Sequence, residues 1–194
     1  MKISYETLAV AAAAAMSFVA VNWAYFKILK IAKAKDLVDN PDARKLQKCP
    51  VPVMGGIAVF IGVVSGILTG LAIQHSAAIP ITPRLLPIVC GMVIMLYTGA
   101  MDDIIGLTPQ SRIVIEILTM LGLIFGSGNC IDTFHGMWGI NNFSWWLAVP
   151  LSVFAGVGII NAINMIDGVN GLSSGLCITC CIFFGTEFIK ASDL

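Results

Sequence analysis

The sequence predicts an all-α, polytopic integral membrane protein with about six transmembrane helices. Of its 194 residues, 58% are hydrophobic and only 11% are charged, whereas soluble proteins are roughly 45–50% apolar and about 25% charged. Apolar stretches of about 20 residues, the length that crosses a bilayer as a helix, recur from end to end. We therefore expect residues 1–194 to form a single membrane-embedded domain, incomplete at its C-terminus because the chain stops just after the last apolar stretch.

Each apolar stretch is expected to be a helix, because lipid offers the backbone no hydrogen-bond partners. The expected helices cover residues 6–29, 54–73, 85–101, 112–127, 146–164 and 171–189. The first is interpreted as a retained span and not a cleaved signal peptide, because only Lys2 precedes the acidic Glu6 and the apolar run continues past Tyr25. The second follows a Pro-rich turn, the third ends at an aspartate pair, and a glycine-containing turn separates the fifth from the sixth.

Lysine and arginine are concentrated at one end of the expected helices. Seven of the eleven lie around the first connection: Lys27, Lys30, Lys33, Lys35, Arg44, Lys45 and Lys48. Because cytoplasmic loops carry an excess of Lys and Arg, three connections are assigned to the cytoplasmic side: residues 30–53, 102–111 and 165–170. The assignment uses no acidic residue, yet it places Asp102, Asp103 and Asp167 on the same side, where they are expected to meet in one site.

Two adjacent carboxylates, Asp102 and Asp103, follow the third apolar stretch at the level of the lipid headgroups. Ionised carboxylates at this depth are costly and usually functional, and neighbouring like charges repel unless a cation neutralises them. Mg²⁺ prefers hard oxygen ligands and typically uses one or two carboxylates together with phosphate oxygens of a substrate. The pair therefore indicates a catalytic metal site; two solvated acids at a helix end are the simpler alternative.

Polar residues recur at every third position at the cytoplasmic end of the fifth span. This spacing places Asn161, Asn164 and Asp167 on one helical stripe. Gly168 and Gly171 then break the helix, which is tolerated near a membrane only where protein or a water-filled cavity satisfies the backbone. The stripe predicts a lined cavity; hydrogen bonds between helices would explain the two asparagines but explain the Asp-Gly pair less well.

Two further groups of charged residues need partners. Arg44, Lys45 and Lys48 suit an anionic ligand, either a diphosphate or a lipid headgroup, and topology-setting charge explains them equally well. Glu116 lies about one turn inside the fourth span, where a buried acid requires compensation. Arg112, four residues earlier in the sequence, is its expected partner.

With these elements in this order, the chain resembles the polyprenyl-phosphate N-acetylhexosamine-1-phosphate transferase superfamily, glycosyl transferase family 4. The resemblance covers essentially the whole chain and rests on three ordered motifs: Arg44-Lys45 with Pro50-x-Pro52-x-x-Gly55-Gly56, Gly99-x-x-Asp102-Asp103-x-x-Gly106-Leu107, and Asn161-Ala-x-Asn164-x-x-Asp167-Gly-x-x-Gly171-Leu172. The chain looks more like the bacterial branch that makes undecaprenyl-diphospho-N-acetylglucosamine than like the muramoyl-pentapeptide branch. It departs from the family pattern at Gln47, where many members have histidine, and at Asn170, which replaces a second aspartate.

The resemblance implies transfer of an N-acetylaminosugar-1-phosphate from a UDP-sugar to undecaprenyl phosphate, with release of UMP. This step would start cell-envelope polysaccharide synthesis at the bacterial cytoplasmic membrane, with Mg²⁺ or Mn²⁺ as cofactor and the active site facing the cytoplasm. The implied catalytic and metal-binding residues are Asp102, Asp103 and Asp167. The implied substrate-binding residues are Arg44, Lys45, Lys48, Asn161, Asn164 and Asn170. The lipid bilayer and a homodimer are the other expected partners, and nucleic acid is not one.

Two other classes of protein are alternatives. A membrane transporter would use the acids for ion or substrate coupling, with carboxylates near the midplane and two related halves; here the acids lie at one level and the sequence has no visible repeat. A catalytically silent membrane scaffold would leave the placement of the acids without a reason.

Overall fold

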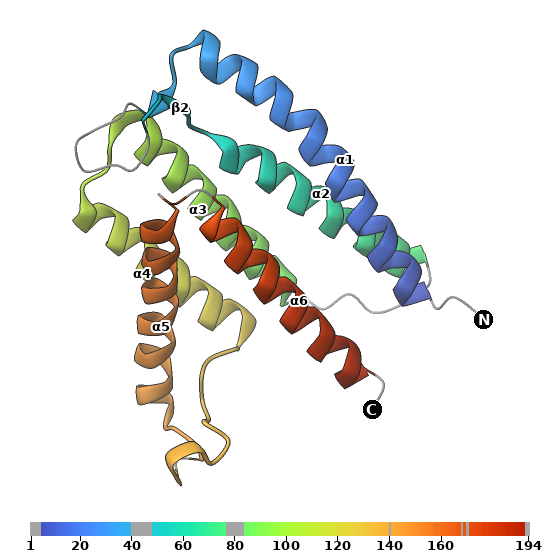
Figure 1. Cartoon of the computed structure of the whole chain (residues 1–194). Coiled ribbons are helices and arrows are strands. Elements are labelled where there is room, and N and C mark those ends of the chain that lie inside the picture. The colour runs from blue at the N-terminus through green and yellow to red at the C-terminus, as the bar shows by residue number, and fades with distance from the viewer. Residues whose placement is uncertain are drawn as a thin grey trace.

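Six α-helices account for most of the described chain, which in this computed structural model comprises residues 5–39, 48–76, 84–139, 141–167, 169 and 171–192. The helices are α1 (Tyr5–Ala34), α2 (Gly55–Ser76), α3 (Leu85–Ile105), α4 (Pro109–Ser127), α5 (Trp145–Ile166) and α6 (Leu172–Ser192). Each overlaps one predicted span (Figure 1). Within the described ranges, the first five are long and apolar enough to cross a membrane, and α6 contains a shorter apolar stretch, Leu172–Phe188. The prediction of an all-α polytopic membrane protein is confirmed.

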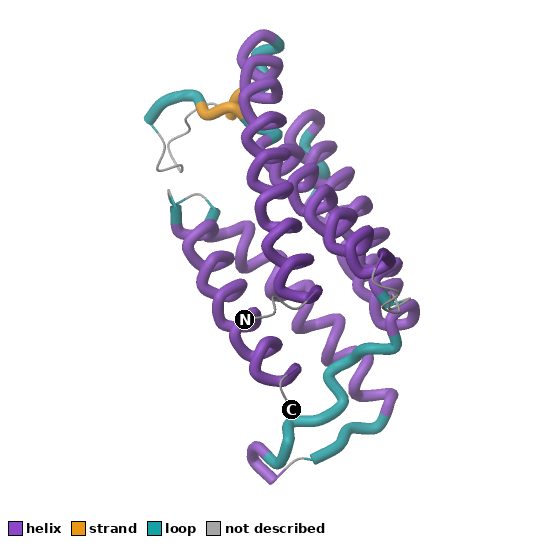
Figure 2. Tube along the Cα trace, turned by 90° about the vertical axis from the view of Figure 1, so that its right-hand side faces the viewer, coloured by secondary structure: helices purple, strands orange, loops and turns teal. Residues whose placement is uncertain are grey.

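The helices run as a bundle whose two short turns, between α3 and α4 and between α5 and α6, lie at one end. The connection between α1 and α2 also lies at this end, and the connection between α4 and α5 lies at the other (Figures 1 and 2). The connection between α4 and α5 contains the short 3-10 helix η1 (Met137–Gly139). The alternation of connections agrees with the topology predicted from charge.

A two-stranded hairpin lies in the connection between α1 and α2. Strand β1 (Val38–Asp39) pairs antiparallel with β2 (Val51–Pro52), and Val38 lies opposite Pro52. The Val53 N–H extends the pairing by donating to the Leu37 carbonyl at 3.1 Å. The sequence predicts only a Pro-rich turn here, because proline cannot donate a backbone hydrogen bond and is confined to sheet edges. A hairpin of two short strands consists of edges alone, so it tolerates Pro52.

Helix α4 begins about one turn earlier than predicted. Thr108 precedes it in an extended conformation, and its hydroxyl accepts a hydrogen bond from the Ser111 N–H at 3.3 Å. Pro109 occupies the first helical position, where its missing N–H has no cost. The earlier start places Arg112 inside the first turn of α4, with its side chain fixed relative to the helix axis.

Helices α1 and α2 pack closely because glycines remove side chains from their interface. A Cβ atom at Gly62 would overlap Cγ2 of Val21, and one at Gly66 would overlap Oγ of Ser17. Small residues allow backbones in a membrane to approach closely, which is the main source of helix association where water supplies no hydrophobic drive. This pair of helices supports the hairpin that leads to the polar end of the bundle.

The close approach at Gly62 makes a testable prediction. In Gly62→Ala, the new methyl meets Val21, whose β-branched side chain has one strongly preferred rotamer in a helix. We expect the free energy of unfolding in bicelles to fall by about 1–3 kcal/mol, the usual cost of overpacking. Gly70→Ala on the same helix is the matched control, because its nearest neighbour would be Ala13 Cβ at 3.8 Å. Equal stability of the two variants would contradict the proposed packing.

Candidate active site

A polar cavity of about 830 Å³ opens at the end of the bundle where the short connections gather. Its charged and amide-bearing lining residues come from β1, α3, α4 and α5 and from the residue that ends α5: Asp39, Asp102, Asp103, Arg112, Asn164 and Asp167. The prediction that the acids of two different connections meet in one place is confirmed by this shared cavity.

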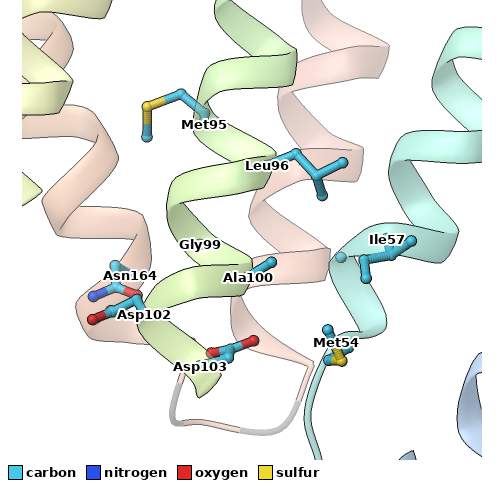
Figure 3. Close-up of a pocket in the computed structure, with 10 residues that line it drawn as sticks. Met54, Ile57, Met95, Leu96, Gly99, Ala100, Asp102, Asp103 and Asn164 are labelled. Atoms are coloured by element: carbon cyan, nitrogen blue, oxygen red, sulfur yellow. The ribbon is translucent and has the colours of Figure 1, made fainter. Parts of the chain in front are cut away.

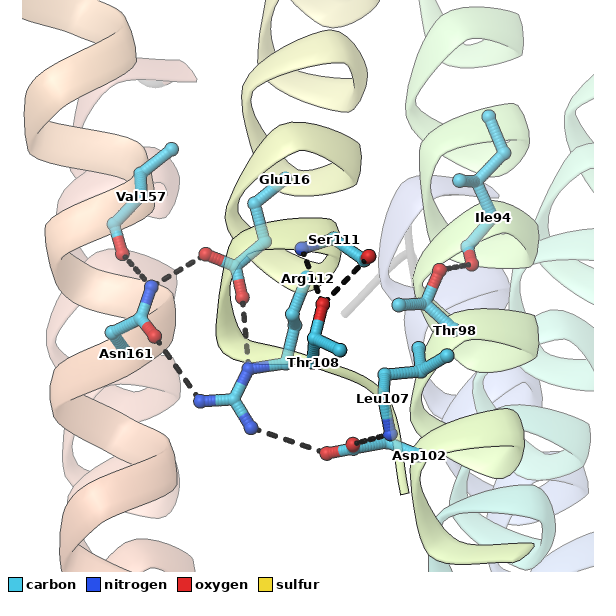
Figure 4. Close-up of polar contacts among 10 residues, drawn as sticks. All are labelled: Ile94, Thr98, Asp102, Leu107, Thr108, Ser111, Arg112, Glu116, Val157 and Asn161. Atoms are coloured by element: carbon cyan, nitrogen blue, oxygen red, sulfur yellow. Dashed lines mark hydrogen bonds and ion pairs between the residues drawn. The ribbon is translucent and has the colours of Figure 1, made fainter. Parts of the chain in front are cut away.

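Asp102 is held by hydrogen bonds to both of its carboxylate oxygens. Oδ1 accepts the Leu107 N–H at 2.9 Å, and Oδ2 accepts Nη1 of Arg112 at 3.1 Å (Figure 4). The first bond requires the chain to fold back directly after α3, which it does at Gly106, whose φ of 68° lies in the left-handed region that glycine adopts freely. The Asp102 carboxylate is therefore fixed in orientation.

Asp103 points to the other side of α3. Successive residues of a helix are about 100° apart around its axis, and Figure 3 shows Asp102 directed toward Asn164 and Asp103 directed toward Met54. The backbone of Met54 hydrogen-bonds the Asp103 carboxylate, and Asp102, Asp39 and Asp167 are near enough to repel it. A smaller pocket of about 250 Å³ lies beside Asp103, between α2 and α3. Asp103 thus lies among like charges.

Arg112 and Glu116 form the ion pair that their spacing predicts. Nε of Arg112 lies 3.7 Å from Oε1 of Glu116, whose side chain is 2% exposed. Asn161 on α5 donates from Nδ2 to the other Glu116 oxygen and to the Val157 carbonyl, and its Oδ1 accepts Nη2 of Arg112 at 3.5 Å. Figure 4 shows the resulting network crossing from α3 through α4 to α5. Its connections to Asp102 and Asn161 are not apparent from sequence spacing.

The predicted stripe at the end of α5 is divided between two environments. Asn164 and Asp167 line the polar cavity, and the Asp167 carboxylate accepts a hydrogen bond from the Ser173 hydroxyl. Asn161 lies one turn deeper, and both of its amide N–H groups are directed to Glu116 and Val157. The structure therefore gives Asn161 two protein acceptors, and its role in substrate binding stays a prediction.

Several predicted substrate-binding residues lie outside the described residues, namely Arg44, Lys45 and Asn170, as does Gln47. Lys48 is described and exposed, and it is not among the residues that line the polar cavity. Asp39 lines this cavity although sequence reasoning did not select it. Little in the sequence selects Asp39 as a site residue, because a single acid is common in a charged connection. Its position on β1 also depends on a hairpin that was not predicted.

The donor set of the cavity fits a hard cation. Its carboxylate and amide oxygens are the ligand type that Mg²⁺ prefers, and Mg²⁺ usually takes only one or two protein carboxylates. Within the described ranges, no three His, Cys, Asp or Glu side chains are grouped closely enough to hold a metal ion by themselves. The arrangement is compatible with a cation whose remaining ligands are phosphate oxygens of a substrate.

A second, apolar cavity of about 500 Å³ lies between α4 and α5. Its lining includes Ile117, Val153 and Gly158, and it reaches Asn161. Asn161 also contacts Arg112, which lines the polar cavity. The apolar space and the charged space share no lining residue, and the contact between Arg112 and Asn161 lies between them.

Comparisons with known proteins identify the family that the chain is similar to. The model of glycosyl transferase family 4 matches residues 85–193. A Bacillus subtilis (strain 168) protein named "Probable undecaprenyl-phosphate N-acetylglucosaminyl 1-phosphate transferase" is 35% identical over 152 residues, which are 78% of this chain and 40% of that protein. Proteins named "Undecaprenyl-phosphate alpha-N-acetylglucosaminyl 1-phosphate transferase" from Yersinia pestis and Escherichia coli (strain K12) are each 30% identical, over 82% and 76% of this chain. The chain spans 38–41% of the length of these relatives. No solved structure matches it.

The ion pair inside the bundle makes a prediction about stability. Arg112→Gln leaves the buried Glu116 without its cation, and breaking a buried pair in this way costs about 3–5 kcal/mol of unfolding free energy. Lys190→Gln is the control, because its pair with Glu187 is exposed and such pairs contribute about 0–1 kcal/mol. Unfolding of both purified variants in bicelles would measure the difference. Equal losses would mean that Arg112 does not compensate Glu116.

Proposed function

Because the chain belongs to glycosyl transferase family 4, we propose that its protein transfers an N-acetylaminosugar-1-phosphate from a UDP-sugar to undecaprenyl phosphate. The products are a lipid-diphospho-sugar and UMP, and the step initiates a cell-envelope polysaccharide. The named relatives are all transferases of this kind, which favours this function over the transporter that the sequence left open.

The observation that carries the proposal is the proximity of a carboxylate-lined cavity to an apolar one. Polyprenyl phosphate is an amphiphile, with a dianionic head and a long hydrocarbon chain. A polar cavity lined by Asp102, Asp103 and Asp167 suits a cation-assisted phosphate reaction, and the apolar space between α4 and α5 suits hydrocarbon. Arg112 of the polar cavity is hydrogen-bonded to Asn161 of the apolar one, so the two spaces are neighbours, and we propose that the phosphate occupies the first and the hydrocarbon the second.

The proposed phosphoryl transfer requires little proton transfer to or from the protein. A phosphate monoester has a second pKa of about 6, so the polyprenyl phosphate is mostly dianionic at cytoplasmic pH and attacks the β-phosphorus of the donor without a strong base. The P–O bond to UMP breaks as the new P–O bond forms, and the leaving group carries away the electron pair. The task of the site is to place both phosphates in line and to reduce their repulsion.

We propose that Asp102, Asp103 and Asp167 hold or position Mg²⁺ or Mn²⁺ that enters together with the donor diphosphate. A bound divalent cation supplies charge neutralisation for phosphoryl transfer. Asn164, which lines the cavity with them, offers an amide oxygen or N–H groups to the donor. Substrate binding is also assigned, from the sequence motifs, to Arg44, Lys45, Lys48, Asn161 and Asn170, and Asn161 in addition contacts Arg112.

The excess of Lys and Arg around the first connection supports a cytoplasmic orientation of the polar end in the bacterial inner membrane. UDP-sugars are cytoplasmic compounds, so this orientation gives the donor direct access. A homodimer remains a prediction, which crosslinking of the full-length protein in native membranes would test.

The first functional prediction concerns the acids. In the full-length protein, Asp102→Asn, Asp103→Asn and Asp167→Asn are each expected to lower sugar-phosphate transfer by at least about 10²-fold, the usual cost of losing one electrostatic group at a reacting centre. Raised Mg²⁺ should restore part of the rate. The measurement is formation of lipid-linked sugar and UMP from labelled UDP-N-acetylglucosamine and undecaprenyl phosphate.

Asp132→Asn is the matched control, because it makes the same chemical change in the connection at the opposite end of the bundle. It should leave the transfer rate unchanged. Near-normal turnover in any of the three site variants would remove that residue from the mechanism, and flux of substrate without a lipid product would favour a carrier.

The second functional prediction concerns the apolar cavity. Gly158 lines it, and a Cβ atom added there would meet nothing within 4 Å. Gly158→Leu should therefore fold normally, occupy part of the cavity and raise KM for undecaprenyl phosphate about tenfold, a loss of about 1.4 kcal/mol of binding. KM for the UDP-sugar should not change.

Gly122→Leu on α4 is the control, because it also points into open space and does not line this cavity. If both variants change KM for the lipid equally, or if Gly158→Leu changes only KM for the donor, the apolar cavity is not the site of the polyprenyl chain.

A further inference from the structure

Arg112 serves three different acceptors with its three guanidinium nitrogens. Nη1 donates to Asp102 at 3.1 Å, Nη2 donates to Asn161 Oδ1 at 3.5 Å, and Nε faces Glu116 at 3.7 Å (Figure 4). The acceptors belong to α3, α5 and α4, respectively. These contacts direct three of the five N–H groups of Arg112 to the protein and so fix the plane of the guanidinium, which also lines the polar cavity.

We propose that Arg112 is a positioning residue for Asp102, and that Glu116 and Asn161 hold Arg112 in place. This inference rests on the proposed function, because it assigns a role to Arg112 in the same reaction. Arginine suits the task because its planar, rigid fork presents several donors at fixed angles, whereas lysine offers only a mobile point charge.

Burial separates the two ends of this network. Glu116 is 2% exposed, whereas the side chains of Arg112 and Asp102 are 31% and 28% exposed. A long side chain at a partly exposed position normally samples several rotamers, and ordering it costs entropy. The charge of Glu116 and the amide of Asn161 restrict Arg112 from the buried side, so that Arg112 meets Asp102 in one orientation.

The network gives Asp102 and Asp103 different electrostatic environments. The negative charge of Asp102 is compensated by Arg112, and both of its oxygens accept hydrogen bonds. Asp103 receives a backbone hydrogen bond from Met54 and lies near three other carboxylates. Among the described residues, Arg112 pairs with Asp102 and not with Asp103. The site therefore has one rigidly held carboxylate, and a shift of about 1 Å in such a group costs about 10²-fold in rate.

A purely structural role for the same network would be the pairing of a buried charge. Arg112→Gln alone cannot separate the two roles, because it leaves Glu116 uncompensated. The double variant Arg112→Gln/Glu116→Gln removes both charges at nearly constant side-chain size, and the glutamine that replaces Glu116 retains a carbonyl oxygen for the Asn161 amide. The double variant therefore restores the balance of buried charge without restoring the bond to Asp102.

The test measures thermal stability and steady-state kinetics of the full-length protein. For the double variant we expect a Tm close to that of the wild type, a kcat about 10²-fold lower, and KM values for the UDP-sugar and undecaprenyl phosphate within about twofold of the wild type. Arg112→Lys, which keeps the charge beside Glu116 and loses the fork, should also lower kcat, and it serves if the double variant does not fold. The exposed pair supplies the control: Glu187→Gln/Lys190→Gln should change neither Tm nor kcat.

The proposal is overturned if kcat recovers together with Tm in the double variant, because Arg112 would then act only in packing. It is also overturned if KM for either substrate rises while kcat is unchanged, because Arg112 would then bind substrate.

Failure of the proposed function would give a different result, because the wild-type protein would then make no lipid-linked sugar from the UDP-sugar and undecaprenyl phosphate. In that case the contact between Arg112 and Asp102 can be followed without enzymatic turnover. The infrared band of the Asp102 carboxylate, identified by its loss in Asp102→Asn, reports this contact. A shift of this band in the double variant supports positioning by Arg112, and an unshifted band overturns it.

Discussion

The candidate site depends on the compensation of one buried charge, the carboxylate of Glu116. An ionised acid that is 2% exposed inside a membrane protein is strongly unfavourable unless it is paired and hydrogen-bonded. Arg112 supplies the opposite charge from one turn earlier on α4, and Asn161 supplies an amide N–H from α5. Because Arg112 must reach Glu116, its remaining nitrogens are fixed in space, and the end of α3 is held to them through Asp102.

This constraint acts through the start of α4. Thr108 and Pro109 begin the helix, so that Arg112 and Glu116 fall in its first two turns on one face. Because residues four positions apart lie on one face of a helix, the face of α4 that carries Arg112 and Glu116 contacts both Asp102 of α3 and Asn161 of α5.

The sequence was sufficient for the parts of the structure that depend on local spacing and on lipid. Apolar length located the six helices, charge asymmetry placed Asp102, Asp103 and Asp167 at one end, and i,i+4 spacing paired Arg112 with Glu116. It was insufficient for contacts between distant segments. Asn161 and Glu116 are 45 residues apart, and only the packing of α4 against α5 brings them together. Asp39 lines the cavity from β1 of a hairpin, where the proline-rich sequence predicted only a turn.

The charge of the polar cavity constrains how any phosphate can enter it. Among the described lining residues, four are carboxylates and one is an arginine, and three of the five N–H groups of that arginine are directed to protein acceptors. A donor diphosphate and a dianionic phosphate would each be repelled by this surface, the more strongly because the dielectric near the membrane is low. Binding both requires additional positive charge. A divalent cation that enters with the diphosphate would supply two positive charges to the phosphate oxygens. The acidity of the cavity is thus an argument for a metal that the substrate helps to bind.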